Sequence, residues 1–514
     1  MKTVLRYYLL ACLTICLLSC NKILEVEKPD NLIQGEFWQN RDQVYTSLIG
    51  LYTSVQNSLN TLHVWGDIRS SLYEPGPGDA FTTEYGQFLS QDIYPANSLL
   101  SWSSVYKSIG WINTFIKNAP AALTNDPTFK ESELNNMLGE AYALRALNYF
   151  YLVRAFKEVP LITEPYESDT QKMNIAASSE ETVLNLIESD LETALQQAPE
   201  SFETANEKFG RVTRNAVRAI WADVKLWRNE YQAALDLCNE LDQQYESSLV
   251  GPFEWFAIFN PGNSPESIFE LQYEPTGTAS PVYDWYAYYS TTSSTGTQYL
   301  ANPANAQLIF EETLYPPTLP DYTSSDTIRY KNYAMFRSDA SVSSGYGSGW
   351  EVYKFLGQQA YQLSYISSND QRLVNYILYR YREILLMEAE AYAMLNRYEE
   401  AEDRINKIRQ QCNIPLLSTG EAGEGEEFFS RLLMEREAEI GFEGKEWFAA
   451  VRIARRSGYQ DVLVNKSATN NSMGYAYQVI RARLLNPESW FLPYQKTELE
   501  NNVQLVQKEY YKNK

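Results

Sequence analysis

Apolar residues recur at intervals of three and four along much of this chain, and this pattern predicts a mainly helical protein. Positions i, i+3, i+4 and i+7 fall on one face of an α-helix, so each such stretch can bury one side against a core. These stretches are concentrated toward both ends of the sequence. The clearest are Phe37–Leu59, Trp102–Ile116, Leu134–Phe156, Thr182–Leu195, Thr213–Trp227, Tyr231–Leu241, Tyr376–Leu395, Ala401–Gln411 and Phe428–Ala454.

Two of these stretches share a finer pattern, which is typical of tetratricopeptide-like helical hairpins. Residues 216–241 and 383–408 each hold an alanine-rich helix, a short polar turn, and a tyrosine (Tyr231 or Tyr398) with an alanine three residues later. Small alanines allow paired helices to approach closely, and the tyrosine fills the turn. We expect Phe428–Ala454 to form a further hairpin about one of its two central glycines. Because a hairpin cannot bury its apolar face alone, these units are expected to stack into a scaffold.

Two long insertions interrupt the helical pattern, at about residues 61–101 and 251–370. Both are rich in Gly, Pro, Ser, Thr and aromatic residues. Disordered segments normally lack aromatic residues, so we predict ordered, irregular lobes with short strands, packed on one side of the scaffold. The predicted fold class is therefore mainly α, as one domain over residues 20–514. Within it the scaffold is expected at about 36–60, 102–250 and 371–456, followed by a C-terminal segment at 457–514.

The N-terminal residues have the layout of a bacterial lipoprotein signal peptide, expected to span residues 1–19. Lys2 and Arg6 supply positive charge, an apolar core too short to span a bilayer follows them, and Ser19 is the small residue that signal cleavage needs. Cys20 would then become the new N-terminus and receive acyl chains, of which two or more give stable anchoring. We therefore predict lipid attachment at Cys20 and a location on a membrane surface outside the cytoplasm.

The scarcity of histidine is the feature of the composition that most restricts which catalytic or metal sites the protein could have. His63 is the only histidine among 514 residues, so a His-based triad, a two-His zinc site or a His proton shuttle would all depend on it. We expect His63 to be a loop residue without a catalytic role. The formal net charge of −22 disfavours nucleic acid or an anionic lipid surface as a partner of the protein itself.

No cofactor or metal is predicted. Neither a phosphate-binding glycine loop nor a zinc pattern occurs, and Asp321 and Asp326 lack the EF-hand spacing for Ca2+. Carboxylate pairs are numerous among 65 acidic residues, and none stands out as the pair of a glycosidase. Cys238 and Cys412 lie in helical patterns and are expected to be buried free thiols.

Four segments carry longer motifs in a fixed order along the chain. They are Gly139–Thr163, whose helix ends in a V-P-L turn; Tyr381–Ile414, with the helix R-E-I-L-L-M-E-A-E-A; Met434–Arg455, with E-R-E-A-E-I-G-F-E-G-K-E-W-F; and Phe491–Tyr511, with Pro493, Glu498 and Asn502. Together with the lipoprotein signal, these segments resemble the SusD/RagB-like outer-membrane lipoproteins of Bacteroidetes nutrient-uptake systems. The chain departs from the family at Lys445, Glu446 and Ala449, where His, Arg and Asp are common, and this affects the expected local packing of the scaffold.

The resemblance implies a non-catalytic role at the cell surface. Members of the family bind a nutrient, usually an oligosaccharide, and cap a TonB-dependent barrel transporter of the SusC-like type. Opening of this lid admits the ligand and closure hands it over. The resemblance also implies that the repeat helices face the transporter, that the irregular lobes hold the ligand, and that only the lipid anchor enters the membrane.

Aromatic residues in the two insertions are the candidates for ligand binding, because a planar ring can cover the apolar face of a sugar. The densest cluster holds Tyr283, Trp285, Tyr286 and Tyr288. Of these we expect Trp285 and Tyr288 to be exposed platforms, although alternate rings could instead form the buried face of a strand. Trp65, Tyr73, Tyr85 and Trp350 could complete the rim of the site. The tryptophans on helical faces, namely Trp102, Trp111, Trp221, Trp227 and Trp447, are expected in the core.

Three other functions remain compatible with the sequence. The same receptor role could serve peptide cargo. A helical glycoside hydrolase could share this length, helicity and aromatic content. The repeats could also form a scaffold for another protein, with the aromatic lobes serving only for packing.

Overall fold

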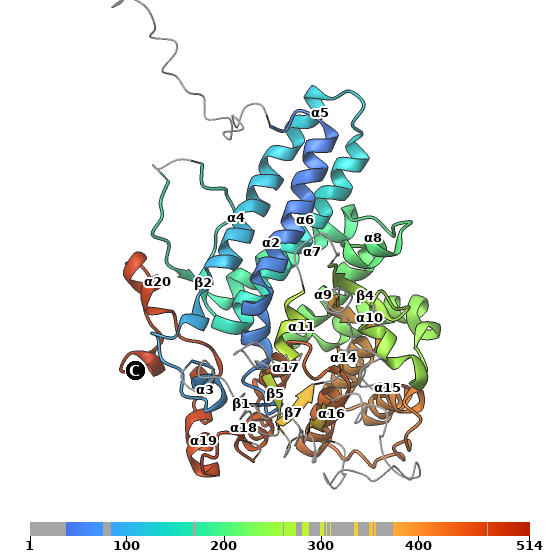
Figure 1. The fold of residues 1–514 in the computed structure, drawn as a ribbon, viewed down its shortest axis with the longest axis vertical. Helices are drawn as coiled ribbons and strands as arrows, with labels where there is room; N and C mark the ends of the chain where they lie inside the picture. Colours follow the sequence, from blue (N-terminus) through green and yellow to red (C-terminus); the bar gives the residue numbers. More distant parts are fainter. Residues whose placement is uncertain are drawn as a thin grey trace, which may run out of the picture.

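The protein is a stack of antiparallel helices joined by short turns, with a few two-stranded sheets (Figure 1). This mainly α fold confirms the predicted class. It is seen in a computed structural model that describes residues 37–75, 84–167, 171–260, 262–273, 280–286, 299–302, 305, 309, 334–337, 349–352, 354–355, 374–469 and 471–514.

Helices make up most of the described chain. Up to residue 245 they are α2 (Arg41–Asp67), α3 (Glu84–Leu89), α4 (Ser103–Asn118), α5 (Ala122–Asn125), α6 (Glu131–Phe156), α7 (Glu180–Gln197), α8 (Ala205–Gly210), α9 (Arg214–Trp227) and α10 (Tyr231–Tyr245). After residue 280 they are α11 (Pro281–Tyr286), α14 (Tyr381–Met394), α15 (Tyr398–Gln411), α16 (Glu426–Ile440), α17 (Glu446–Ala454), α18 (Gln460–Thr469), α19 (Tyr477–Leu484) and α20 (Lys496–Asn501).

The predicted helical hairpins are present at α9–α10, α14–α15 and α16–α17. In the first two, the turn contains an asparagine in the left-handed region, Asn229 with φ 62° and Asn396 with φ 60°. Asparagine tolerates this conformation better than most residues. Alanines such as Ala234 and Ala401 are fully buried between the paired helices, so the small side chains permit the close approach that the sequence predicted.

Two predicted boundaries differ from the structure. Helix α2 continues to Asp67, well past the predicted end at Leu59, because the apolar residues Leu62, Val64 and Trp65 are all buried against the core. His63 therefore lies in a helix and is fully buried, so the expectation of a loop residue was wrong.

The second difference is at Tyr376–Arg380, which was expected to begin a helix and instead forms strand β8. It pairs antiparallel with β4 (Ser267–Leu271), which lies near the start of the preceding insertion. Aromatic and branched residues favour a strand where such a partner is available. Helix α14 begins only at Tyr381, whose N–H donates to the carbonyl of Glu266 at 2.8 Å.

The remaining strands are short and pair antiparallel across long stretches of sequence. Strand β1 (Tyr73–Pro75) pairs with β5 (Tyr299–Ala301), β2 (Val159–Pro160) with β3 (Ala177–Ser178), and β6 (Ala334–Arg337) with β7 (Gly349–Val352). The pairing of β1 with β5 matters most for function, because it joins the first insertion to the second.

The core expectations for tryptophan and cysteine are largely confirmed. Trp102, Trp227 and Trp447 are buried, and Cys238 and Cys412 are buried free thiols. Trp221 is only partly buried against the core. Trp111 was expected in the core but is 44 % exposed on α4, where Lys107 lies over its ring.

Many charged side chains are also buried in the scaffold, and they are paired with one another. Within the described part of the chain, eight cations and eight carboxylates form ion pairs in which both partners are buried. The cations are Arg145, Arg154, Lys354, Arg380, Arg382, Arg436, Lys445 and Arg452, and the carboxylates are Asp190, Asp223, Glu266, Glu383, Glu390, Glu439, Glu443 and Glu446.

The densest pairing holds β8 and the start of α14 against α16 and the turn that follows it. Arg380 contacts Glu439 at 2.9 Å and Glu443 at 2.8 Å, and Arg382 contacts Glu266 at 3.0 Å. Burial alone would raise the pKa of Glu443, but Arg380 and Lys354 together hold that pKa below its usual value. Glu443 therefore remains charged, and these ion pairs tie three segments together.

Two of the three residues that depart from the family pattern, Lys445 and Glu446, belong to these buried ion pairs. The ammonium of Lys445 donates to Glu383 at 2.5 Å and to the carbonyl of Leu378 at 2.7 Å. Glu446 accepts from Arg436 at 3.0 Å. Each substituted charge therefore has a buried partner, which accounts for the local packing.

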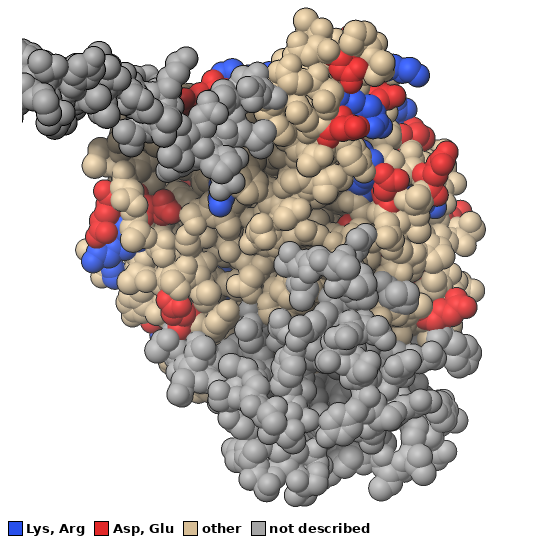
Figure 2. Space-filling model, turned by 45° about the horizontal axis from the view of Figure 1, so that its top comes forward, with Lys and Arg blue, Asp and Glu red and all other residues tan. Residues whose placement is uncertain are grey.

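The surface charge pattern is different. On the face shown in Figure 2, acidic and basic side chains are interspersed over the described surface rather than gathered into separate patches. Exposed pairs such as Arg397 with Glu400 contribute little to stability, because solvent screens them.

We predict that Arg380→Met lowers the free energy of unfolding by about 3–5 kcal/mol, because it leaves buried Glu439 and Glu443 short of a cation. Urea titration followed by circular dichroism measures this change. Arg397→Met is the control, since Arg397 and Glu400 are each 44 % exposed, and it should change stability by less than about 1 kcal/mol. Equal effects of the two substitutions would contradict the structural role assigned to the buried pairs.

Candidate functional site

The two insertions meet the scaffold at the C-terminal end of α2. A short turn leads from Asp67 into β1, which pairs with β5 so that Tyr73 lies opposite Ala301. The pairing continues beyond the strands, because the N–H of Asn302 donates to the carbonyl of Leu72 at 2.7 Å. Residues more than two hundred positions apart in sequence are thereby fixed side by side, next to α17 (Figure 1).

Aromatic rings from three elements surround His63 of α2 at this junction. The His63 ring stacks on Trp285 of α11, with ring centroids 4.4 Å apart and planes 24° apart. Tyr73 of β1 and Tyr376 of β8 approach His63 edge-on, at 6.2 Å and 6.3 Å. All four side chains are buried. We call His63, Asp67, Tyr73, Trp285 and Tyr376 the histidine cluster.

A chain of hydrogen bonds runs through the histidine cluster to the scaffold. The hydroxyl of Tyr73 lies 2.5 Å from Oδ2 of Asp67 and 3.2 Å from Nε2 of His63. The other carboxyl oxygen of Asp67 accepts from the backbone N–H of Glu446, the first residue of α17, at 3.1 Å. Asp67 thus joins the last turn of α2, strand β1 and the start of α17.

Burial shifts the pKa values of His63 and Asp67 in opposite directions. It lowers the pKa of His63 to about 3, so the imidazole is neutral at physiological pH. It raises the pKa of Asp67 to about 7, with the negative charge of Glu446 adding to the effect and the Tyr73 hydroxyl opposing it. A neutral, fully buried His63 is poorly suited to act as a general base on a substrate from solution.

Close packing of backbone against backbone sets the position of this junction. A Cβ atom at Gly66 would lie 2.0 Å from the carbonyl oxygen of Gly444, far inside van der Waals contact. Gly444 has φ +82°, and a Cβ atom there would lie 2.0 Å from the hydroxyl of Tyr376. Only glycine fits at either position, so the turn between α16 and α17 can reach α2.

The structure brings two of the predicted ligand-binding residues together, Trp285 and Tyr73, but it buries both. Trp285 is 2 % exposed, so the expectation that its ring is an exposed platform was wrong for this structure. Its ring stacks on His63, which the sequence placed in a loop. The rings of Trp285 and Tyr73 instead pack against the scaffold, where the two insertions join it.

Trp65 also lies away from any surface. It is 1 % exposed, packs edge-on against Phe156 with centroids 4.9 Å apart, and its indole N–H donates to the carbonyl of Leu99 at 2.9 Å. The expectation that Trp65 helps form a ligand-binding rim is therefore wrong in this structure, because α2 extends through this residue and turns it into the core.

The remaining candidates are only partly placed. Tyr85 lies on α3 and is partly buried against the core. Tyr283 and Tyr286 lie on α11, and Trp350 lies on β7 opposite Phe336. The side chains of these last three residues, and the whole of Cys20, Tyr288, Asp321 and Asp326, lie outside the described part of the chain.

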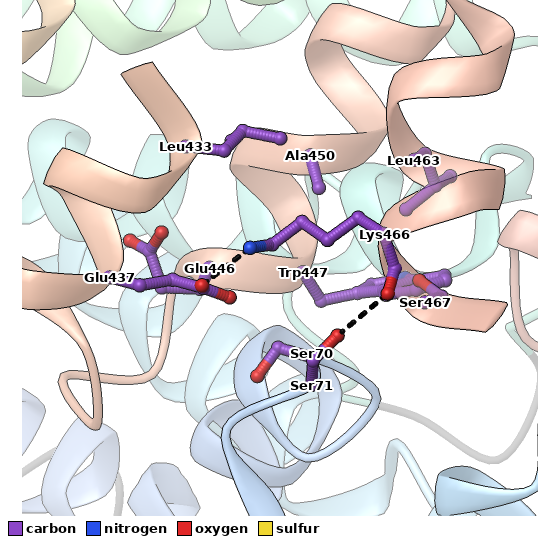
Figure 3. A pocket seen from close by; sticks show the side chains of 10 residues that line it. All are labelled: Ser70, Ser71, Leu433, Glu437, Glu446, Trp447, Ala450, Leu463, Lys466 and Ser467. Carbon is purple, nitrogen blue, oxygen red and sulfur yellow. Dashed lines mark hydrogen bonds and ion pairs between the residues drawn. The ribbon is translucent and has the colours of Figure 1, made fainter. Parts of the chain in front are cut away.

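A small pocket lies beside the histidine cluster, between the end of α2 and helices α16, α17 and α18 (Figure 3). Across it the ammonium of Lys466 pairs with Glu437 at 2.5 Å, and the hydroxyl of Ser71 lies 3.5 Å from the carbonyl of Lys466. The enclosed space suits about one water molecule, which is too little for a sugar ring. It serves the packing of charged groups and is not a ligand site.

Sequence reasoning missed Asp67 and Tyr376. Asp67 is one of 65 acidic residues, and no local pattern separates it from the others. Tyr376 was assigned to a helix rather than a strand. Gly66 and Gly444 were the available signals, because a glycine within a helix and a glycine in a turn are both candidates for close backbone approach.

No metal centre is found among the described residues, since no three His, Cys, Asp or Glu side chains there are grouped to hold an ion. Within the same part of the chain, every helix is too short or too polar to cross a bilayer.

Two family models match successive parts of the chain. The model described as the SusD family matches residues 278–511, and the model described as starch-binding, associating with the outer membrane, matches residues 27–226. A similar curated relative is SusD-like protein P38 of Formosa agariphila, which is 26 % identical over 475 residues, covering 84 % of this chain and 88 % of the relative.

Solved structures of SusD-like proteins have the same fold as this chain. A SusD superfamily protein of Bacteroides thetaiotaomicron aligns with a TM-score of 0.72 and 19 % identity, over 92 % of this chain and 99 % of that one. Surface glycan-binding protein A of Bacteroides uniformis aligns with a TM-score of 0.71 and 19 % identity, over 91 % and 99 %.

We predict that Gly66→Ala lowers the free energy of unfolding by about 1–3 kcal/mol, because the new methyl group collides with the Gly444 carbonyl. Gly50→Ala is the matched control in the same helix, since a Cβ atom there meets nothing within 4 Å. It should raise stability by about 0.5–1 kcal/mol, the usual gain for replacing glycine in a helix. Urea titration of both variants is the measurement, and loss of stability in both would argue against a local contact.

Proposed function

The chain belongs to the SusD/RagB-like family, and from this premise we propose that it binds an oligosaccharide nutrient at the cell surface without cleaving it. We propose further that it passes the ligand to a partner SusC-like, TonB-dependent barrel transporter, for which it acts as the lid. The ligand is held by the two insertions, and the helical scaffold supports them.

The observation that carries this proposal is the pairing of β1 with β5, which unites the two insertions into one lobe. Both insertions are rich in tyrosine and tryptophan, whose flat rings suit the apolar faces of sugars. We call this united unit the recognition lobe, and we assign its ligand contacts to the rings outside the histidine cluster, Tyr288 first. The full-length match to a surface glycan-binding protein supports a glycan as the ligand.

A non-catalytic role is supported by the state of the ionisable groups. The single histidine is buried and neutral, and its pKa is lowered to about 3. The buried carboxylates around Arg380 and Arg382 are held in ion pairs. Neither set can easily supply the general acid and the second carboxylate that glycoside hydrolysis needs.

We predict that the protein lacking its signal peptide binds one class of oligosaccharide on a glycan array and releases no reducing ends from it. Tyr288→Ala should weaken that binding about five- to thirtyfold, since stacking of a ring on a sugar contributes on the order of 1–2 kcal/mol. Isothermal titration measures both affinities. Trp111→Ala is the control, because Trp111 is exposed on the scaffold, on α4, and its loss should leave the affinity unchanged.

Other outcomes of this experiment would select a different function. Binding of peptides but of no glycan would keep the receptor role and change its cargo. Release of reducing ends at an enzymatic rate would identify a glycoside hydrolase and refute the lid role.

We predict that Cys20→Ala moves the protein from the membrane fraction to the soluble fraction, because acyl chains on Cys20 are the proposed anchor. Immunoblotting of fractionated cells gives the distribution. Cross-linking in intact membranes should capture a barrel transporter with the wild-type protein. A Cys20→Ala variant that stays fully in the membrane would rule out this anchor.

A further inference from the structure

We propose that the protein has a further carbohydrate-binding surface, made mainly by its C-terminal segment, where three tyrosines surround an ion-paired carboxylate. The inference deepens the proposed function and rests on it for the class of ligand. The geometry of the surface, however, lies wholly within the described residues. We call it the tyrosine surface, and it consists of Tyr94, Tyr475 and Tyr510 with Asp92, Arg483 and Lys514.

The base of the tyrosine surface is the carboxylate of Asp92, which pairs with two cations. Its Oδ1 accepts from the ammonium of Lys514 at 2.7 Å, and its Oδ2 lies 3.1 Å from the guanidinium of Arg483. The other terminal nitrogen of Arg483 donates to the carbonyl of Ser90 at 2.6 Å. These bonds bring the residues that follow α3, the helix α19 and the C-terminus to one corner of the molecule (Figure 1).

The same two cations also hold the tyrosine rings. The guanidinium of Arg483 lies over the ring of Tyr475, 4.9 Å from its centroid. The ammonium of Lys514 lies 4.7 Å from the ring centroid of Tyr510 and 5.6 Å from that of Tyr94. A cation over an aromatic face is attracted by the ring electrons. The rings still reach solvent, since Tyr94 is 41 % and Tyr475 is 43 % exposed.

Backbone hydrogen bonds fix the segments that carry these rings. The side-chain amide of Asn471 donates to the carbonyl of Leu89 at 3.0 Å, and its oxygen accepts from the N–H of Tyr475 at 3.4 Å. The N–H of Tyr510 donates to Glu488 at 2.9 Å. Exposed rings that are already held in place lose little conformational freedom when a ligand covers them. The tyrosine surface is therefore preorganised for binding.

A neutral sugar fits this surface better than an anion does. A tyrosine ring can cover the apolar face of a sugar, while its hydroxyl and nearby charged groups bond to the sugar hydroxyls. Arg483 and Lys514 already share the carboxylate of Asp92, so a phosphate or sulfate would have to displace it. The formal net charge of −22 also repels polyanions.

Hydroxyl-radical footprinting of the whole protein tests this surface directly, because exposed tyrosines are oxidised and a bound ligand protects them. The probes are four soluble polysaccharides of neutral sugars: starch, xylan, mannan and laminarin. With one of them at saturation, oxidation of Tyr94 and Tyr475 should slow about threefold or more. Tyr166 is the matched control, since it is also 43 % exposed but lies between β2 and β3. Its oxidation should not change.

Substitution at the exposed rings gives a second measurement. The double variant Tyr94→Ala with Tyr475→Ala should weaken binding of the protecting polysaccharide about fivefold or more in affinity electrophoresis. The double variant with Phe at both positions should keep most of the affinity, because the rings remain. Tyr166→Ala should match the wild type. Since Tyr94 and Tyr475 are exposed, none of these variants should lower the melting temperature appreciably.

The outcomes separate this proposal from the proposed function. If a polysaccharide binds but leaves the oxidation of Tyr94 and Tyr475 unchanged, or if the double Ala variant binds it as the wild type does, the tyrosine surface is refuted and the receptor role stands. Protection of these rings by a partner protein and by no polysaccharide would also refute it. If the wild type binds none of the four polysaccharides and no glycan on the array, the proposed function fails, and this surface fails with it.

Discussion

Burying a charged side chain costs several kcal/mol unless an opposite charge and hydrogen bonds accompany it, and the central helices of this protein depend on that pairing. Arg380 is the last residue of β8 and Arg382 is the second residue of α14, and both are fully buried. Arg380 pairs with Glu439 and Glu443, and Arg382 pairs with Glu439. These contacts fix the turn between α16 and α17 at one place. The same turn carries Gly444, which packs closely against Gly66 of α2 and Tyr376 of β8.

Asp67 is a buried carboxyl group that, unlike Glu439 and Glu443, has no cation beside it among the described residues. It lies within the same buried environment, yet it has backbone and hydroxyl donors in place of a cation. Its ionised form is therefore disfavoured, and its pKa rises to about 7. Where the scaffold of paired charges meets β1, one buried carboxyl group is thus held by a backbone N–H and a hydroxyl group.

Much of the scaffold could be predicted from local sequence because helices and hairpins are local structures. The periodicity of residues 131–156 or 214–227 requires only neighbours three and four positions away, and the observed helices α6 and α9 match it. The misses have long-range causes. Tyr376–Arg380 forms a strand because Ser267–Leu271 is there to pair with it, and Trp111 is exposed because the rest of the fold leaves that face of α4 uncovered.

The sequence by itself determined the helical class, the hairpins with their alanines and turn residues, the family motifs, and the two aromatic insertions. The tertiary structure decided which aromatic rings are buried and which charges meet. A period of two or 3.6 residues tells which face of an element is apolar, but not which partner covers it. Trp285 and Tyr73 are residue types that often line binding surfaces, but here both are buried in contact with His63. His63 lies more than two hundred residues from Trp285 in the sequence. Contacts between residues so far apart leave no local signal in a single chain.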